Sequence, residues 1–244
     1  MLAIIGGTGL TQLANLDVSR REVVRTPYGE PSGPIICGAI RGVPVIFLAR
    51  HGDAHTIPPH EVNYRANLWA LKEQGASEVV SVASVGGIRK DLGPGKIVVP
   101  HQIIDCTWGR AHTYFDNGAP VKHIDFTEPY TGALRARLLG AAKKSGQTAV
   151  DGAVYAATQG PRLETAAEID RLEKEGADIV GMTGMPEASL AREIDLAYAA
   201  VAAVVNHAAG RGDSARGIQV QQIEEVLKDT MSRVRKIIDS LVTA

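Results

Sequence analysis

The residues best suited to bind an anion stand at the end of a short apolar segment. Residues 45–49 are apolar, and Arg50, His51 and Gly52 follow them. An unbroken apolar run of this length is typical of a strand that is covered on both faces in an α/β protein. Ligands of open α/β sheets bind beyond the carboxyl ends of the strands, and a guanidinium offers a fork of donors that suits phosphate or carboxylate. The segment therefore predicts an anion site, with a surface Arg beside a loop His as the alternative.

Polar residues follow other apolar segments in the same way. Thr8 lies in the glycine turn of residues 6–9, directly after the apolar residues 2–5, and the N–H groups of such a turn can face an anion. A dinucleotide fingerprint would need a glycine where Gln12 stands, so a Rossmann cofactor site is not predicted. Further candidate groups at strand ends are Ser84, Thr183 and Asn206.

The elements that would position these groups alternate between strands and helices. We predict strands over residues 2–5, 34–40, 43–48, 78–83, 96–105, 153–158, 178–182 and 196–205. We predict helices from about Tyr64 to Gly75, over 132–145 with Thr131 as cap, after Glu164 to Glu175, from Pro186, and over 220–241. Residues 84–87 are expected to form a flexible loop, and residues 107–130 a long binding loop or lid. Without a linker or repeat, residues 1–244 are predicted to form a single α/β domain.

Composition excludes several classes of function. The chain has a net charge of −1 and no long basic run, so nothing favours nucleic acid or an anionic membrane as a partner. Its longest apolar run, residues 197–205, is too short to span a bilayer as a helix. Two cysteines and no basic leader segment suggest a cytoplasmic protein. His51 and His55 have the spacing of a zinc helix, but Gly52 and the following prolines oppose a helix there, so no metal site is predicted.

Taken together, the motifs resemble the trimeric purine nucleoside phosphorylases and, among them, most closely the 5′-methylthioadenosine phosphorylase branch. The motifs that carry the resemblance are residues 5–10, 49–52 with 55–57, 62–67, 160–162, and 182–183 with 186–187. The resemblance implies a three-layer α/β fold with a central mixed β-sheet flanked by helices. It implies reversible phosphorolysis of a nucleoside, with inorganic phosphate as co-substrate and neither a metal nor an organic cofactor. The residues that match the phosphate pocket of the family are Thr8, Arg50, His51, Ser84 and Thr183, and Met182 matches the residue under the ribose.

The positions that read the base depart from the branch that the chain otherwise resembles. Adenine-type members carry two Asp residues where this chain has Asn206 and Ala208, and 6-oxopurine-type members pair an Asn with a Glu in the position of Glu164. A carboxylate at Glu164 would accept the N1–H of a 6-oxopurine, and Asn206 would donate to O6 and accept a proton held at N7. These two residues are therefore the expected catalytic pair, unless Glu164 is only a first-turn helix residue. His207 is expected beside them, and Leu163 replaces the usual Phe against the base.

The residues expected beside the sugar predict a 5′-methylthio group on the substrate. Ordinary nucleoside phosphorylases carry a His fourteen residues after the base-reading Asn, whereas this chain has Val220 there and Ile223 one turn later. An apolar wall suits a methylthio group, because each buried methylene contributes about 0.8 kcal/mol; packing of the last helix is the alternative explanation. The expected substrate is therefore S-methyl-5′-thioinosine, which would give hypoxanthine and 5-methylthioribose 1-phosphate.

Three alternatives to this substrate stay open. They are a 5′-methylthioadenosine phosphorylase, a general inosine/guanosine phosphorylase and, from another class, a non-catalytic purine-nucleoside binding protein. The resemblance also implies a homotrimer in which the segment around His123 reaches into the site of a neighbouring subunit.

Overall fold

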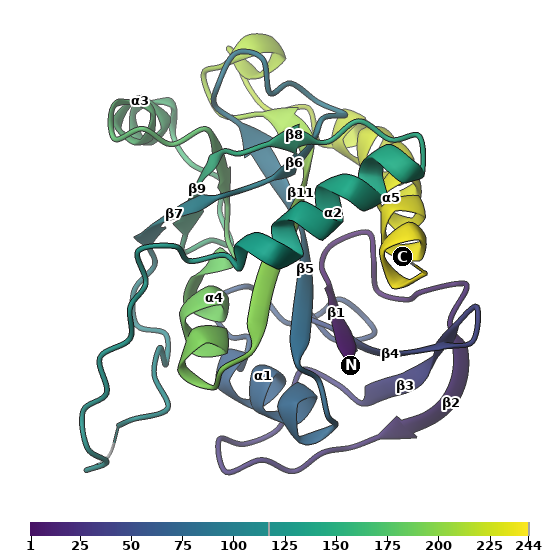
Figure 1. The fold of residues 1–244 in the computed structure, drawn as a ribbon. Coiled ribbons are helices and arrows are strands. Elements are labelled where there is room, and N and C mark those ends of the chain that lie inside the picture. The colour runs from purple at the N-terminus through teal and green to yellow at the C-terminus, as the bar shows by residue number, and fades with distance from the viewer. Residues whose placement is uncertain (117, 244) are drawn as a thin grey trace.

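A computed structural model describes residues 1–116 and 118–243 of the chain, without the side chains of Val220 and Gln222. Within them, helices cover a mixed β-sheet on both sides, and α2 crosses in front of the central strands in Figure 1. The strands are β1 Leu2–Gly6, β2 Asp17–Glu22, β3 Ile35–Ile40, β4 Val43–Ala49, β5 Glu78–Gly87, β6 Ile97–Val99, β7 Gln102–Cys106, β8 Val150–Asp151, β9 Val154–Thr158, β10 Ile179–Gly181 and β11 Ala197–His207. The helices are α1 Tyr64–Glu73, α2 Gly132–Lys144, α3 Ala166–Lys174, α4 Gly184–Glu193 and α5 Val220–Val242, with a 3₁₀ turn over Gly212–Ser214.

Strand β5 is the centre of the sheet. It runs parallel to β1 on one side and to β11 along its whole length, and β1 is also parallel to β4. The carboxyl ends of these four strands therefore meet at one edge. Strand β10 pairs with the end of β5 in the opposite direction, with Val180 opposite Gly86. This reversal brings the residues that follow β10 back toward the middle of β5, beside residues 83–85.

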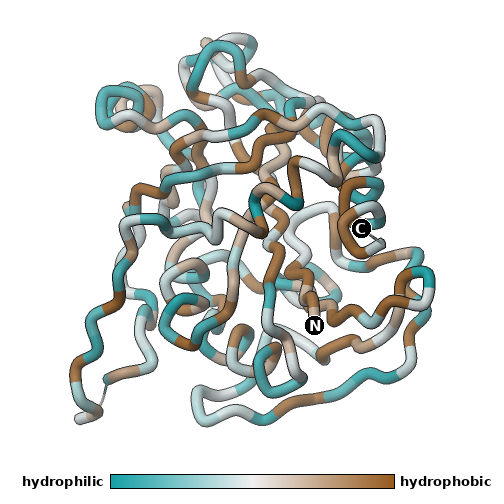
Figure 2. Tube along the Cα trace, viewed as in Figure 1, coloured by the Kyte–Doolittle hydropathy of each residue, from teal (hydrophilic) through white to brown (hydrophobic). Residues whose placement is uncertain are grey.

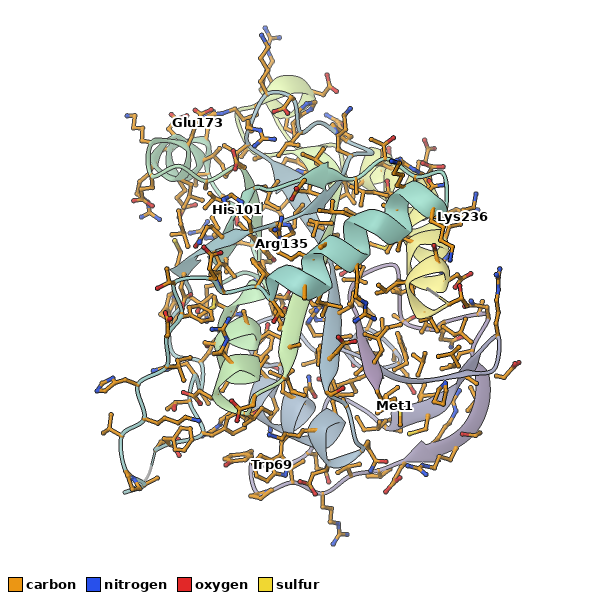
Figure 3. All side chains as sticks on the ribbon, in the orientation of Figure 1. Met1, Trp69, His101, Arg135, Glu173 and Lys236 are labelled. Carbon is orange, nitrogen blue, oxygen red and sulfur yellow. The ribbon has the colours of Figure 1, made fainter. Side chains whose placement is uncertain are left out.

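Two apolar layers hold the helices against the sheet. Successive residues of a strand point to opposite faces, so Leu2 and Ile4 of β1 pack with α2 and α5, whereas Ala3 and Ile5 pack with α1 and α4. Figure 2 shows hydrophobic residues along the central strands and hydrophilic ones on the outer loops, and side chains occupy the space between sheet and helices (Figure 3). The predicted three-layer α/β architecture is confirmed. Within the described residues, no helix is long and apolar enough to cross a membrane.

Several local predictions are confirmed by the backbone. The strands predicted on either side of residues 41 and 42 form an antiparallel hairpin, which turns at Arg41 and Gly42 with positive φ (50° and 80°) and pairs Ile40 with Val43. Residues 107–116 and 118–130 carry no helix or strand and belong to an arm that extends from the body of the molecule (Figure 1). Thr131 precedes α2 as predicted, but its hydroxyl accepts the Tyr198 N–H at 3.0 Å and makes no cap hydrogen bond to the helix.

Other local predictions were wrong. Residues 84–87 do not form a loop, because β5 continues through them and stays paired with β11 as far as Gly87 and His207. The strand predicted over residues 96–105 is two strands, separated at Pro100 and paired with different neighbours. Proline cannot donate a ladder hydrogen bond, which explains the break. The polar strand β2, which pairs with β3 at one edge of the sheet, was not predicted.

Candidate functional site

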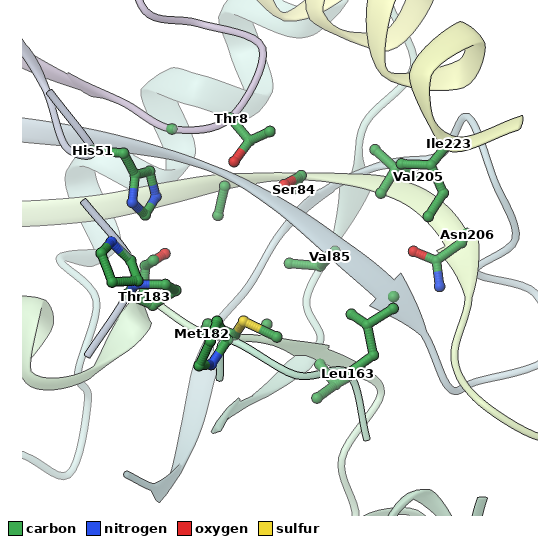
Figure 4. Close-up of a pocket in the computed structure, with 18 of the residues that line it drawn as sticks. Thr8, His51, Ser84, Val85, Leu163, Met182, Thr183, Val205, Asn206 and Ile223 are labelled. Carbon is green, nitrogen blue, oxygen red and sulfur yellow. The ribbon is translucent and has the colours of Figure 1, made fainter. Parts of the chain in front are cut away.

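A cavity of about 390 Å³ lies where the carboxyl ends of β1, β4, β5 and β11 meet the turn after β10. The residues predicted from sequence that line it are Thr8, Arg50, His51, Ser84, Leu163, Glu164, Met182, Thr183, Asn206, Ala208 and Ile223. Figure 4 shows the polar groups Thr8, His51, Ser84 and Thr183 gathered toward one end, and Leu163 and Asn206 at the other. Residues from seven separate segments of the chain therefore face a common space of the size of a small ligand.

Arg50 is fully buried beneath the polar end, and most of its hydrogen bonds go to protein groups. Its Nε and Nη2 donate to the two carboxylate oxygens of Glu187 at 2.7 and 3.0 Å, Nη2 also donates to Ser81 Oγ at 2.6 Å, and Nη1 donates to the Val82 carbonyl at 2.9 Å. The fork expected to hold an anion thus holds Glu187. A guanidinium carries five N–H groups, so one hydrogen on Nη1 is left for a ligand. Burial opposes the charged form of Arg50, but Glu187 outweighs it and raises the pKa of Arg50.

The imidazole of His51 is neutral and has a fixed tautomer. Its Nδ1 lies 2.8 Å from the Ile57 carbonyl, which can only accept, so Nδ1 carries the proton. Burial, with the nearby charge of Arg50 as the second cause, lowers the pKa of His51 to about 4. The bare Nε2 is therefore an acceptor at neutral pH. It matches the hydroxyl of a monoprotonated phosphate.

The remaining groups of the polar end supply neutral donors. Thr8 Oγ1 lies 3.0 Å from Nε2 of His55, which also lines the cavity. Thr183 is buried at the start of α4, and its N–H donates to the Tyr155 hydroxyl at 3.3 Å. Ser84 lies within β5 and not in a loop, so its position is fixed by the sheet. A set of hydroxyl donors around one guanidinium hydrogen is chemically suited to a tetrahedral oxyanion.

The other end of the cavity carries the two groups predicted to read a base. The Asn206 amide donates to the His207 carbonyl at 2.7 Å, and this hydrogen bond leaves its Oδ1 as an acceptor toward the cavity (Figure 4). Glu164 is half-buried in the segment that joins β9 to α3, before the helix begins. It is therefore not a first-turn helix residue, and its Oε1 accepts the Thr158 hydroxyl at 2.6 Å. Ala208 contributes only a methyl group to this wall.

An apolar wall closes the cavity on the side of α5. Val205 and Ile223 both face the cavity in Figure 4, and Ile218 lines it as well. Val220 opens α5, but its side chain lies outside the described residues.

Two predicted residues do not reach this cavity within the chain. His207 lies next to Asn206 in β11 and so points to the other face of the strand, where its ring contacts Gly212 and its Nδ1 is 3.4 Å from the Asp213 N–H. His123 is exposed on the arm of residues 107–130.

Sequence reasoning missed two buried residues that shape the cavity. Glu187 was noted only as part of a motif, because an acidic residue in the first turn of a helix usually serves the helix dipole. Arg110 was passed over in the long loop, yet it is 8% exposed and its guanidinium donates to the carbonyls of Thr158, Gln159, Met182 and Met185 at 2.6 to 3.2 Å. It joins the end of β9 to the turn after β10. A lone Arg in an irregular segment carries no sequence signal for such a role.

Comparison with known proteins agrees with this geometry. Residues 1–243 match the Phosphorylase superfamily. A probable S-methyl-5′-thioinosine phosphorylase of Pseudomonas syringae is 53% identical over 99% of this chain and 98% of its own length. A 6-oxopurine nucleoside phosphorylase of Pyrococcus furiosus is 41% identical over 97% of this chain and 90% of its own.

Similarity extends to solved structures. Methylthioadenosine phosphorylase of Schistosoma mansoni, solved with adenine, superposes with a TM-score of 0.93 at 32% identity, over 99% of this chain and 90% of that one. The family match and the structural superposition each cover almost the whole chain. The chain belongs to the Phosphorylase superfamily.

Proposed function

We propose that this protein catalyses the phosphorolysis of S-methyl-5′-thioinosine to hypoxanthine and 5-methylthioribose 1-phosphate. The observation that carries the proposal is the meeting of Glu164 and Asn206 at one end of a cavity whose other end is built for an oxyanion. Ala208 leaves that base end without the second carboxylate that would accept from an exocyclic amine in an adenine-type site. The 53% identity to a probable S-methyl-5′-thioinosine phosphorylase supports the same assignment.

The proposed reaction begins with phosphate held by Thr8, Ser84, Thr183 and the remaining Nη1 hydrogen of Arg50. A phosphate oxygen forms a bond to the anomeric carbon while the bond from that carbon to N9 breaks, and the electron pair leaves with the purine. N7 of the departing purine takes up a proton from water, and Asn206 Oδ1 accepts a hydrogen bond from that N7–H, which stabilises the departing base. The phosphate charge lies beside the developing oxocarbenium ion and stabilises it electrostatically. Neither a metal nor an organic cofactor is part of this proposal.

A general 6-oxopurine nucleoside phosphorylase is the second candidate, and the relative from Pyrococcus furiosus favours it. The base end would be the same in both cases, so the two functions differ only at the 5′ position of the sugar. Val205, Ile218 and Ile223 give that side an apolar character. A buried 5′-hydroxyl without a partner would cost about 1–3 kcal/mol, which favours the methylthio substrate by roughly 10- to 100-fold.

The proposal is tested by measuring release of free base from S-methyl-5′-thioinosine, 5′-methylthioadenosine, inosine and adenosine, each with and without phosphate. We expect phosphate-dependent release, fastest from S-methyl-5′-thioinosine. Release without phosphate would identify a nucleosidase, and binding without release under either condition would identify a binding protein. Equal kcat/KM for the two methylthio nucleosides would contradict the base-reading argument.

The proposal also covers the domain organisation, the oligomeric state and the cellular location of the protein. We propose a single domain over residues 1–244, a homotrimer in which His123 on the exposed arm approaches the cavity of a neighbouring subunit, and a cytoplasmic location. Arg192 donates to the carbonyls of Asp125 and Glu128 at 2.7 and 2.5 Å and so ties the part of the arm that follows His123 to its own subunit. An active monomer in light scattering would contradict the trimer.

A further inference from the structure

We infer that Thr158 is a positioning residue that determines base specificity by holding the Glu164 carboxylate in the nucleoside cavity, an inference that rests on the proposed function. Thr158 is the last residue of β9, whose register is set by β10 and β7 on either side. Its hydroxyl lies 2.6 Å from Glu164 Oε1 and 3.2 Å from the Gly181 carbonyl. A hydroxyl has one proton to donate, and the shorter distance places that proton on the bond to Glu164.

This hydrogen bond matters because Glu164 stands in the wall between two hollows. One is the nucleoside cavity, and the other is an outer hollow of about 180 Å³ that is also lined by Arg162 and Arg171. Two guanidinium groups in the outer hollow attract a carboxylate. Each has an acidic partner, since Arg162 donates to Glu168 at 2.7 and 2.8 Å and Arg171 lies 3.6 Å from Glu175, but a guanidinium can accommodate a second carboxylate.

Thr158 opposes that outward movement. Among residues 1–116 and 118–243, the Thr158 hydroxyl is the one group that donates a hydrogen bond to the Glu164 carboxylate. The second carboxylate oxygen, Oε2, accepts no hydrogen bond from these residues. Oε2 is then available to accept the N1–H of a 6-oxopurine. The backbone of Thr158 is itself fixed, because Arg110 donates to its carbonyl at 3.2 Å and to that of Gln159 at 2.8 Å. A hydroxyl on a rigid strand end thus fixes a carboxylate on a connecting segment.

The test compares Thr158→Val, which keeps the shape and removes the hydroxyl, with Thr158→Ser, which keeps the hydroxyl. We expect Thr158→Val to lower kcat/KM for S-methyl-5′-thioinosine about 10-fold, the effect of one lost buried hydrogen bond. The value for 5′-methylthioadenosine should change less than about twofold, because adenine does not use the carboxylate as an acceptor. The KM for phosphate should not change, and Thr158→Ser should restore the selectivity.

Two controls separate this role from a general structural one. Thr107→Val removes a threonine hydroxyl that donates to a carboxylate, Asp105, at 2.7 Å, but outside the nucleoside cavity, and it should leave the selectivity unchanged. In a Glu164→Gln background, Thr158→Val should have little further effect on selectivity, because the two residues act as one unit. Thr158→Ala, with folding checked by thermal unfolding, provides the same comparison if the valine variant does not fold.

The outcomes are distinguishable. An unmodified protein that releases no base from S-methyl-5′-thioinosine would overturn the proposed function itself. An active protein whose ratio of kcat/KM for the two methylthio nucleosides is the same with and without the Thr158 hydroxyl would overturn this inference and leave the proposed function intact. Additive effects of Thr158→Val and Glu164→Gln would also overturn it.

Discussion

The neutral state of His51 predicts how the stability of the protein depends on pH. Its pKa is about 4 in the folded chain and about 6.5 in an unfolded one. Between these values the unfolded state binds a proton that the folded state does not, so stability rises with pH in this window and falls as the solution is acidified. The stabilising contribution is complete above the unfolded pKa, and it is lost as the pH falls toward 4.

The size of the effect follows from the two pKa values. A difference of about 2.5 units corresponds to about 3 kcal/mol over the whole window, and about 2 kcal/mol of it falls between pH 7 and pH 5. His51 is 7% exposed, so solvent screening does not reduce this figure appreciably. Carboxylates titrate mostly below this range, so the interval from pH 7 to pH 5 isolates the contribution of histidine.

The assay is urea unfolding at pH 7, 6 and 5 in phosphate-free buffer, for the unmodified protein and for His51→Asn. Asparagine keeps an N–H that can donate to the Ile57 carbonyl but does not titrate, so its stability should fall by about 2 kcal/mol less over this range. Both proteins are compared at one concentration, because subunit association would add to the stability. Parallel pH profiles for the two proteins would refute the neutral, buried assignment of His51.

Three further predictions concern the other buried groups. Glu187→Gln leaves the Arg50 charge buried without its partner and should destabilise the fold by about 3–5 kcal/mol in chemical unfolding; the double change Arg50→Met with Glu187→Leu should recover part of that loss. Arg110→Lys cannot reach all four carbonyls and should lower kcat/KM at least about 10-fold, with a smaller effect on melting temperature. Asn206→Asp with Ala208→Asp should shift the ratio of kcat/KM toward 5′-methylthioadenosine by about 10- to 100-fold, and an unchanged ratio would contradict the base-reading scheme.

Much of the site was predictable because the sequence shows where the apolar strands end. Arg50 and Asn206 each follow an apolar run in a strand parallel to its neighbour, and parallel strands bring such positions to one edge. Thr183 also follows an apolar run, but it reaches the same cavity because β10 runs antiparallel to the end of β5. The alternation of side chains along a strand is a second guide: Asn206 lines the cavity, whereas the ring of the next residue, His207, lies against Gly212. The register shift between Val204 and Asn206 interrupts this alternation, and Val205 lines the cavity together with Asn206.

The parts that could not be predicted depend on contacts between distant segments. Gly86 and Gly87 suggested a flexible loop, but they lie in β5, where glycine is required by crowding: a Cβ on Gly87 would lie 1.8 Å from the Leu92 carbonyl oxygen. The partner of Arg50 is 137 residues away in sequence, at Glu187. Such pairings follow from the register of the whole sheet and not from any local pattern.

The pairing of Arg50 with Glu187 has a consequence for the proposed chemistry. The guanidinium charge is compensated by a carboxylate 2.7 Å away, and the neighbouring His51 is neutral, so the polar end holds no uncompensated cation among the described residues that line it. A phosphate dianion bound there keeps most of its negative charge. Stabilisation of an oxocarbenium ion by that charge grows as the reaction proceeds, whereas a free cation would tighten the ground state and weaken this effect. In the proposed reaction, the buried ion pair would position phosphate through one directed hydrogen bond from Arg50 and leave the phosphate charge to act on the transition state.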